Sequence, residues 1–314
     1  MLKIEIQNNW KTDIIGYAQN IESLENTNYP AWTVRLDDSY GVAIPYSGVE
    51  EINESFARAR IRSANISVLT GNVRSALVLT TDTETIKEPF SILCEALIDP
   101  GENGSRRVLI ESSPVTWWKE WKELLGNKNI DERIYDLLGE LCVFKYAIQN
   151  YEDCEWNGPN GASYDIETNK EFIEVKSTIN RQKTEITISN QFQLFPQNKS
   201  LAIVFCRFEP TIMSGISIDS ILNDFAELGY NVDLINTKIE NKGFEKGMSA
   251  RKKTFLLHEM LMFNVDDSFP RITPGSFVGG VLPEGITKIT YTVDLSGRTA
   301  TSLLLEDYYD IQNN

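Results

Sequence analysis

The sequence has few of the residues on which several common protein sites depend. It contains four cysteines, without the spacing of a zinc site, and a single histidine, His258. A structural zinc site is therefore disfavoured, and reduced thiols in a cytoplasmic protein are the simpler interpretation. Because one histidine supplies only one candidate base, a Ser-His or Cys-His mechanism is disfavoured as well.

Long apolar runs are also missing. No stretch reaches the roughly 18 apolar residues of a membrane-spanning helix, and the first ten residues alternate instead of forming a charged and then apolar leader. We therefore expect a cytoplasmic protein with no membrane partner. At 314 residues, the chain is long enough for one large domain or for two to three smaller ones.

A basic excess is absent too, since the net charge is −15. Nucleic-acid enzymes usually carry a basic surface, because neutralising phosphates supplies much of their affinity. Basic residues do gather in residues 179–199 and 242–253, which are either phosphate-binding segments or ordinary solvated faces. The candidate phosphate contacts are Arg181, Lys183, Lys246, Arg251, Lys252 and Lys253, with Arg106 and Arg107 as further candidates.

The pattern along the chain predicts three parts. Short β-branched segments separated by turn residues indicate a β-rich domain over residues 1–112, with one helix near 89–98. Residues 113–210 begin with a helix at Ser113-Pro114, whose tryptophans we expect in core packing. Residues 211–314 are predicted to be β-rich with one helix, over 217–228.

The middle part contains the clearest helix, over about 131–150, with Glu140 at the border of its apolar stripe. Strands are predicted at 163–167, 171–178, 185–189 and 201–208. A short loop between the first two would pair Glu167 with Phe172 and place Asp165 opposite Glu174. Opposed residues have Cβ atoms about 4.5–5.5 Å apart, so both carboxylates could bind one hard divalent ion.

Several neighbours support this metal interpretation. Lys176 shares a strand face with Glu174. Glu140 could add a third carboxylate, and Gln191 and Gln193 follow the next strand. The alternative is an ordinary surface hairpin with outward-facing charges, because an Asp followed by Glu-x-Lys often occurs by chance.

The order of these residues resembles the signature of the PD-(D/E)XK nuclease superfamily. The likeness covers about residues 114–295, and its segments look like those of bacterial PD-(D/E)XK proteins encoded beside DNA methyltransferases and ATPases in restriction and anti-phage clusters. Its segments are Gly139-Glu140-Leu141, Trp156-Asn157-Gly158-Pro159, Glu174-Val175-Lys176-Ser177-Thr178, Gln193-Leu194, Phe269-Pro270-Arg271-Ile272 and Leu282-Pro283. One departure is Tyr164, which stands where the motif has proline.

The resemblance implies an α+β fold with a restriction-endonuclease-like mixed sheet flanked by helices, between β-rich terminal regions. It implies that Asp165, Glu174 and the Val175 carbonyl bind Mg²⁺ or Mn²⁺, with Glu140 acting through water or at a second ion. Lys176 would orient the attacking water or stabilise the transition state, and Gln193, or less readily Gln191, would contact a phosphate or steady Lys176.

The resulting hypothesis is a cytoplasmic, metal-dependent endonuclease that cuts double-stranded DNA in a restriction or defence system, with other subunits of that system as partners. Double-strand cleavage by an enzyme with one site would favour a homodimer. The main alternative is a non-catalytic nuclease-like subunit, for whose protein contacts an acidic surface is natural. A third is an acid/base hydrolase with paired carboxylates, in which Lys176 has no evident role.

Overall fold

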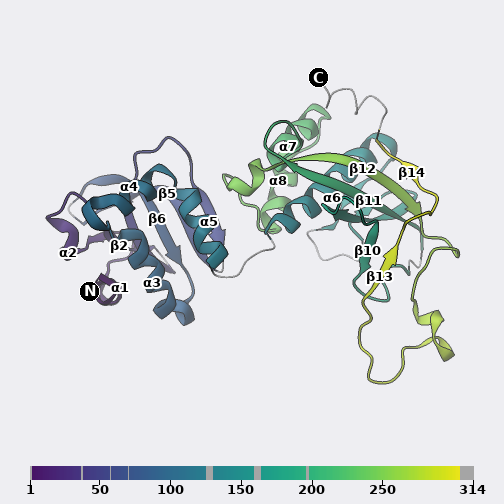
Figure 1. Cartoon of the computed structure of the whole chain (residues 1–314), viewed down its shortest axis with the longest axis horizontal. Helices are drawn as coiled ribbons and strands as arrows, with labels where there is room; N and C mark the ends of the chain where they lie inside the picture. Colours follow the sequence, from purple (N-terminus) through teal and green to yellow (C-terminus); the bar gives the residue numbers. More distant parts are fainter. Residues whose placement is uncertain are drawn as a thin grey trace. The chain divides into compact units, whose positions relative to one another are not determined.

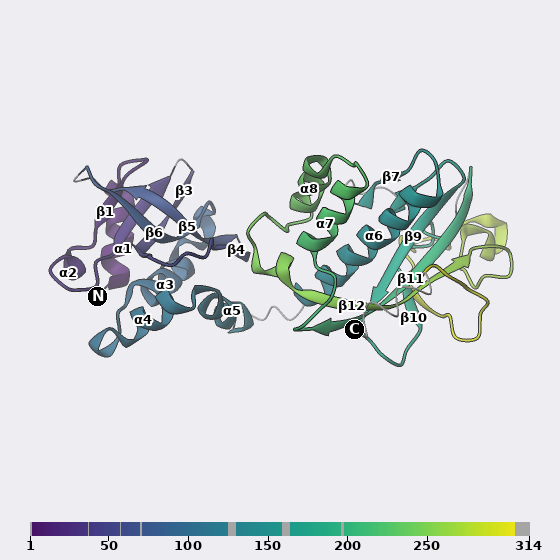
Figure 2. The same cartoon turned by 90° about the horizontal axis from the view of Figure 1, so that it is seen from above.

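The computed structural model describes residues 2–36, 38–56, 58–69, 71–124, 130–158, 164–195 and 198–304. The chain forms two compact units, one of residues 1–128 with 245–249 and the other of residues 129–244 with 250–314. Their helices and strands are labelled in Figures 1 and 2. No helix among these residues has the length and apolar character needed to span a bilayer.

The first unit is built on a six-stranded antiparallel sheet of order β1-β2-β3-β6-β5-β4. Alternation along each strand gives the sheet two buried faces. On β3, Val42 and Ile44 pack against the helices, whereas Ala43 lies in a smaller cluster on the other face. The strands are β1 (Ala18–Asn20), β2 (Trp32–Leu36), β3 (Ser39–Pro45), β4 (Asn53–Phe56), β5 (Ala59–Ser67) and β6 (Val73–Thr81).

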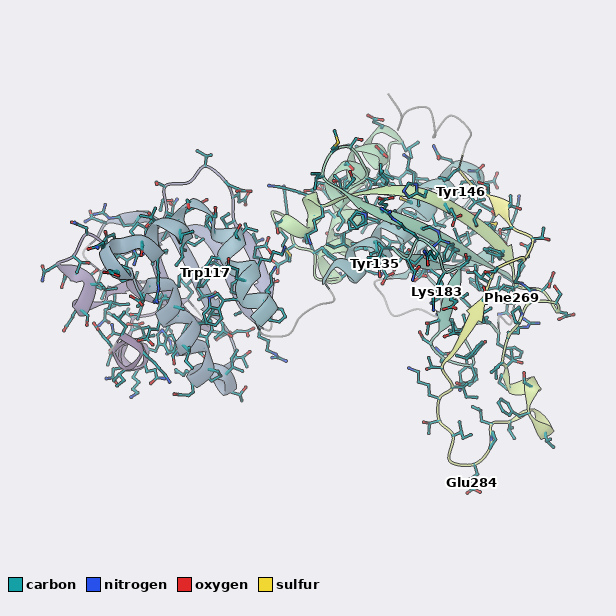
Figure 3. All side chains as sticks on the ribbon, viewed as in Figure 1. Trp117, Tyr135, Tyr146, Lys183, Phe269 and Glu284 are labelled. Carbon is teal, nitrogen blue, oxygen red and sulfur yellow. The ribbon has the colours of Figure 1, made fainter. Side chains whose placement is uncertain are left out.

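Helices cover one face of this sheet, and the largest buried side chains lie between the two layers. They are α1 (Leu2–Thr12), α2 (Glu22–Glu25), α3 (Lys87–Ile98), α4 (Ser105–Ser112) and α5 (Pro114–Leu124). The tryptophans of α5 pack in this core as predicted, with Trp118 fully buried and Trp117 against it (Figure 3). Helix α1 was missed because its first residues alternate, whereas the spacing of Ile6 and Trp10 on one face determines the structure.

The second unit contains a mixed sheet of order β14-β12-β11-β9-β8-β7, in which only β9 and β11 are parallel. A mixed sheet flanked by helices confirms the predicted α+β fold class. The strands are β7 (Glu155–Trp156), β8 (Ile166–Glu167), β9 (Glu171–Thr178), β11 (Ser200–Thr211), β12 (Thr254–Asn264) and β14 (Thr301–Ser302).

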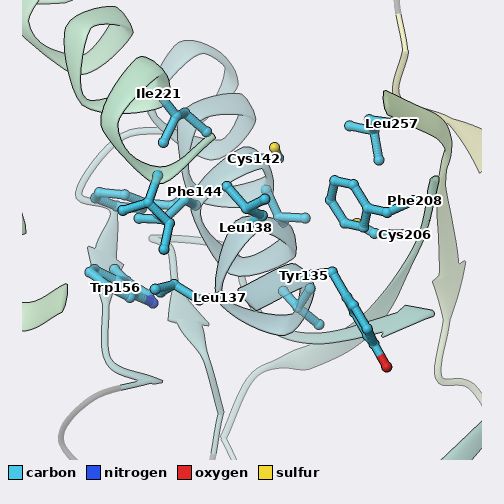
Figure 4. Close-up of a cluster of buried hydrophobic side chains, with 14 of the residues drawn as sticks. Tyr135, Leu137, Leu138, Cys142, Phe144, Trp156, Cys206, Phe208, Ile221 and Leu257 are labelled. Carbon is cyan, nitrogen blue, oxygen red and sulfur yellow. The ribbon is translucent and has the colours of Figure 1, made fainter. Parts of the chain in front are cut away.

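Three helices cover one face of the mixed sheet: α6 (Ile130–Asn150), α7 (Ile218–Glu227) and α8 (Val232–Asn241). Figure 4 shows how Leu138 of α6 and Phe208 of β11 enter the core between these layers. Helix α7 lies within the predicted range 217–228, and Ser217 begins it as the N-cap of a capping box. Helix α8 was not predicted, although Val232, Ile235 and Ile239 have helical spacing.

The opposite face of the sheet packs against a small two-stranded sheet, β10 (Glu185–Ile188) with β13 (Tyr291–Asp294). Central strand β11 is therefore buried on both sides, with Ile203 and Phe205 turned to this second cluster. Phe269 of the late sequence motif is buried in the same cluster. The following loop, which contains Glu284, extends away from the sheet before returning as β13 (Figure 3).

These two units differ from the predicted three parts. The α5 helix belongs to the first unit, because its tryptophans complete the core under the first sheet. The predicted boundary at residue 210 falls inside β11, and strands from both sides of it share one sheet and one core. Residues 211–304 therefore form no separate β-rich domain, and they contain two α-helices instead of one.

The packing of α6 on β9 positions Glu140 and depends on Gly139. A Cβ at residue 139 would lie 2.1 Å from Ser177 Oγ but 3.4 Å from Ser177 Cβ and Val175 Cγ1. The Ser177 hydroxyl is buried without a hydrogen-bond partner among the described residues. The close approach of helix and strand is therefore limited by this one oxygen atom.

We predict that the effect of Gly139→Ala on the free energy of unfolding has opposite signs in the natural chain and in a Ser177→Ala background. In the natural chain the new methyl group overpacks the interface, at a cost of about 1–3 kcal/mol. In a Ser177→Ala background the clash is gone, and the better helix propensity of alanine stabilises by up to about 1 kcal/mol. Denaturant unfolding of the four chains measures this cycle. Equal effects of Gly139→Ala in both backgrounds would contradict the packing argument.

Candidate active site

The hairpin that carries the two predicted carboxylates forms with the predicted register. Ile166 pairs with Ile173 and Glu167 with Phe172. The buried Thr168 closes the turn, because its hydroxyl accepts the backbone N–H of Glu171 at 3.0 Å and of Lys170 at 3.2 Å. The side chain that fixes this turn therefore also fixes which residues of the two strands face each other.

Asp165 lies just before β8, where the register would place it opposite Glu174. One of its carboxylate oxygens accepts the backbone N–H of Val175 at 2.8 Å. The N–H and C=O of a strand residue point to the same side of the strand, so the Val175 carbonyl faces the same edge of β9 as Asp165. Because β8 is only two residues long, this edge is not covered by β8 beyond Ile173.

Glu174 is buried and already has two polar neighbours. Lys176 Nζ lies 2.8 Å from its carboxylate, as two residues on one strand face allow. The side-chain amide of Gln193 donates to the same carboxylate oxygen. Gln193 is also oriented from the other side, because its amide oxygen accepts the Ser189 N–H at 2.7 Å. The glutamine is thus positioned by the end of β10.

The turn that carries Gln193 is held by the C-terminal part of the chain. Gln191 is buried, and its side-chain oxygen accepts the Ile289 N–H at 3.2 Å. Gln191 therefore supports the turn, and no hydrogen bond joins it to Glu174 among the described residues. Arg271 of the late motif donates to the Leu194 carbonyl at 3.3 Å. Conversely, Tyr291 of β13 accepts the Ile272 N–H at 3.0 Å. The late motif therefore positions the site without entering it.

Glu140 points from α6 into the same region, where Trp156 and Lys242 bind it. The Trp156 indole N–H donates to Glu140 at 2.8 Å. The Lys242 ammonium lies 2.5 Å from one carboxylate oxygen and 2.6 Å from the other. A Cβ at Gly158 would lie 2.2 Å from Glu140 Oε2 and 3.1 Å from Lys242 Nζ, so only glycine allows this close approach of the backbone.

Burial and mutual repulsion act on the three carboxyl groups. The pKa of Glu174 is raised to about 7, mainly by burial and also by the charge of Asp165, with Lys176 opposing both. Burial likewise raises the pKa of Glu140 to about 7, with Asp165 adding to the shift and Lys242 opposing it. Burial also raises the pKa of Asp165, against the Val175 N–H and both lysines. A cation bound beside these three carboxyl groups would stabilise their ionised forms.

These groups line a cavity of about 480 Å³ between α6, β9 and β10. Its lining includes five carboxyl side chains and one lysine: Asp136, Glu140, Asp165, Glu174, Glu185 and Lys176. The excess of negative charge would repel a phosphate and attract a divalent cation. The cavity would therefore attract an anion only after a cation has bound in it.

The donor set fits one hard divalent ion. Asp165 and Glu174 supply carboxylates, the Val175 carbonyl faces the same edge, and a Mg²⁺-like ion would keep several waters. No group of three or more Asp, Glu, His or Cys side chains in the described ranges forms a metal cage. An ion here would thus be bound by two carboxylates and a carbonyl. Glu140 would not be a ligand, because it is paired with Lys242.

The predicted phosphate-contacting residues have different environments. The prediction that Arg251 contacts phosphate is wrong, because its side chain is buried and its guanidinium donates to Asp219 and Asn236, both at 2.7 Å. Arg107 is buried in the first unit and donates to the Pro30 and Ile98 carbonyls. The remaining candidates are exposed at the surface: Arg181, which pairs with Glu209, Lys183, Lys246 in the first unit, Lys252 and Lys253.

Sequence reasoning missed Lys242 as a residue of the site. It was counted within a basic segment, whereas it is the C-cap of α8, followed by Gly243 with φ +91°. A helical apolar pattern ending in Lys-Gly is a recognisable helix end. That signal could have placed the lysine at a helix terminus, but its contact with Glu140 spans 102 residues and has no local signature.

Comparison with known proteins gives one match. The model of a family described as "Putative PD-(D/E)XK family member, (DUF4420)" matches residues 21–296. No curated protein and no solved structure matches the chain. The matched range includes the Asp165, Glu174 and Lys176 cluster and most of both units. The chain therefore belongs to this family of the PD-(D/E)XK superfamily.

Proposed function

We propose that the second unit is a metal-dependent endonuclease that hydrolyses phosphodiester bonds of double-stranded DNA. The observation that carries the proposal is the shared cavity of Asp165, Glu174 and Lys176, in which the half-buried Asp165 helps to raise the pKa of the buried Glu174. The family to which the chain belongs supports a nuclease-like fold. The resemblance of its motifs to bacterial proteins encoded beside DNA methyltransferases and ATPases supports a role in restriction or phage defence.

Each residue has a distinct part in the proposed reaction. Asp165 and Glu174, with the Val175 carbonyl, would hold Mg²⁺ or Mn²⁺, which lowers the pKa of a bound water and stabilises charge on the attacked phosphate. Lys176, 2.8 Å from Glu174, is positioned to orient the attacking water or to neutralise the transition state. Gln193 keeps the Glu174 carboxylate in one orientation.

A second candidate function is a non-catalytic subunit that binds partner proteins in a defence complex. The net charge of −15 favours it, because an acidic surface weakens contact with DNA. Two of the candidate phosphate contacts, Arg107 and Arg251, are also buried. The two candidates differ in whether the acidic cluster must be intact for function, so substitutions in that cluster separate them.

For the nuclease, we predict that Asp165→Asn and Lys176→Ala each lower DNA cleavage at least about 100-fold, since each removes a charge that acts on the transition state. Plasmid nicking with Mg²⁺ or Mn²⁺, alone and with candidate partner proteins, measures the effect. Asp224→Asn is the matched control, because Asp224 pairs with Lys145 at 2.6 Å and does not line the cavity.

The expected result is full metal-dependent cleavage by the natural chain and the control, and none by the two variants. Absence of cleavage under every condition, together with undiminished partner binding by both variants, would favour the non-catalytic subunit instead. Cleavage that persists in Asp165→Asn at the natural rate would assign the activity to another site or to a contaminant.

We also predict that Mn²⁺ or Mg²⁺ stabilises the natural chain against heat but not Asp165→Asn. A ligand at about 100 times its Kd adds about 2.7 kcal/mol to the stability of the state that binds it. Asparagine keeps an oxygen that can accept the Val175 N–H, so the metal-free fold is preserved. Thermal unfolding with and without metal measures the difference, and equal shifts in both proteins would exclude Asp165 as a ligand.

A further inference from the structure

The pairing of Lys242 with Glu140 has a consequence for how many metal ions the site holds. Glu140 is 8% exposed and accepts three hydrogen bonds from within the second unit, two from Lys242 and one from Trp156. Three of the roughly four lone-pair sites of this carboxylate are thereby used. The Lys242 ammonium, in contact with both oxygens, also repels a second cation from Glu140.

The position of Lys242 is set by the end of α8 and not by a flexible surface loop. The helix ends in two reverse hydrogen bonds, from Gly243 N–H to the Glu240 carbonyl at 2.8 Å and from Phe244 N–H to the Ile239 carbonyl at 3.3 Å. Phe244 is buried in the core of the unit. The last turn of a helix also favours a cation, through its unpaired carbonyls.

A second lysine of α8 contacts the segment that contains Trp156. Lys238 Nζ donates to the Trp156 carbonyl at 2.6 Å. The Trp156 side chain in turn packs against Phe144 of α6, beside Leu137 (Figure 4). Lys242 lies over the Trp156 ring, 5.8 Å from its centre. The Lys242 ammonium thus contacts both the Glu140 carboxylate and the Trp156 ring, and the absence of a side chain at Gly158 leaves space for it.

The two lysines of the site pair with different carboxylates. Lys242 lies 2.5 Å from Glu140, and Lys176 lies 2.8 Å from Glu174. Asp165 accepts the Val175 N–H and forms no ion pair with a described residue. It is therefore the carboxylate of the group that a bound cation would neutralise, together with its neighbour Glu174.

We propose that Lys242 takes the place of a second metal ion, so that the site binds one divalent cation at Asp165 and Glu174 while Glu140 serves as the counter-ion of Lys242. This rests on the proposed metal site, which it deepens by assigning the ion count and a fixed cation at Glu140. Lys242 is a positioning residue here, because it acts through Glu140 and through its charge.

Mn²⁺ binding to the full chain tests the proposal without reference to cleavage. Titration followed by the electron paramagnetic resonance of free Mn²⁺ gives the count and the affinity. We expect one ion per chain. Lys242→Met should raise the affinity by about threefold to tenfold, as expected when a charge several ångströms away is removed under partial screening. Lys145→Met is the matched control, since Lys145 pairs with Asp224 and does not line the cavity.

The double variant Glu140→Gln with Lys242→Met replaces the ion pair by neutral side chains of similar length and guards against misfolding of the single variant. If Glu140 is only a counter-ion, this variant still binds one Mn²⁺, with an affinity within about threefold of the natural chain. Asp165→Asn should lose binding in the same titration. Circular dichroism shows whether each variant is folded.

Two ions bound by the natural chain would overturn the proposal, as would an unchanged or lower affinity in Lys242→Met. A loss of at least about tenfold in the double variant would make Glu140 a metal ligand and would also overturn it. These outcomes leave the proposed nuclease intact. Failure of the natural chain to bind any Mn²⁺ would instead remove the metal site itself, and with it both proposals.

Discussion

The site depends on carboxylates that are buried together at an exposed strand edge. Asp165 and Glu174 come from neighbouring strands, and Glu140 comes from the helix that packs on them. Taking an ionised carboxyl group out of water is costly unless charges or hydrogen bonds compensate it. The surrounding residues provide that compensation, namely Lys176 and Gln193 for Glu174, Lys242 and Trp156 for Glu140, and the Val175 N–H for Asp165.

This constraint explains why so much of the second unit converges on one cavity. Helix α6 can place Glu140 there because Gly139 lets it approach β9 closely. Helix α8 contributes its terminal lysine, and the late Phe269-Pro270-Arg271-Ile272 segment holds the turn that contains Gln193. None of these supports is needed to form a mixed sheet. They are needed to keep several like charges buried at one place, which is a feature of functional sites more than of cores.

The sequence predicted the parts of the site that local geometry determines. A short turn fixes the register of a hairpin, so the pairing of Glu167 with Phe172 followed from spacing alone and is confirmed. The amphipathic pattern of α6 placed Glu140 at the border of the apolar stripe, whereas the structure buries every residue from Leu137 to Phe144, Glu140 included. The α+β fold class is confirmed for the same reason, since its elements have strong periodicity.

What the sequence could not show depends on distant contacts. Counting charges grouped Lys242 with Arg251, yet one binds Glu140 and the other is buried against Asp219 and Asn236. The division at residue 210 failed because β12 returns to pair with β11. In each case the deciding partner lies tens of residues away and leaves no trace in local periodicity.

The acidic balance of the chain has a different meaning once these contacts are known. Arginines that would be expected on a DNA-binding surface, such as Arg107 and Arg251, are used to satisfy buried carbonyls and carboxylates. The cavity itself contains more carboxyl groups than lysines. An anionic ligand would be repelled by such a cavity until a cation has entered it. The net charge of the chain therefore does not by itself exclude DNA as the substrate.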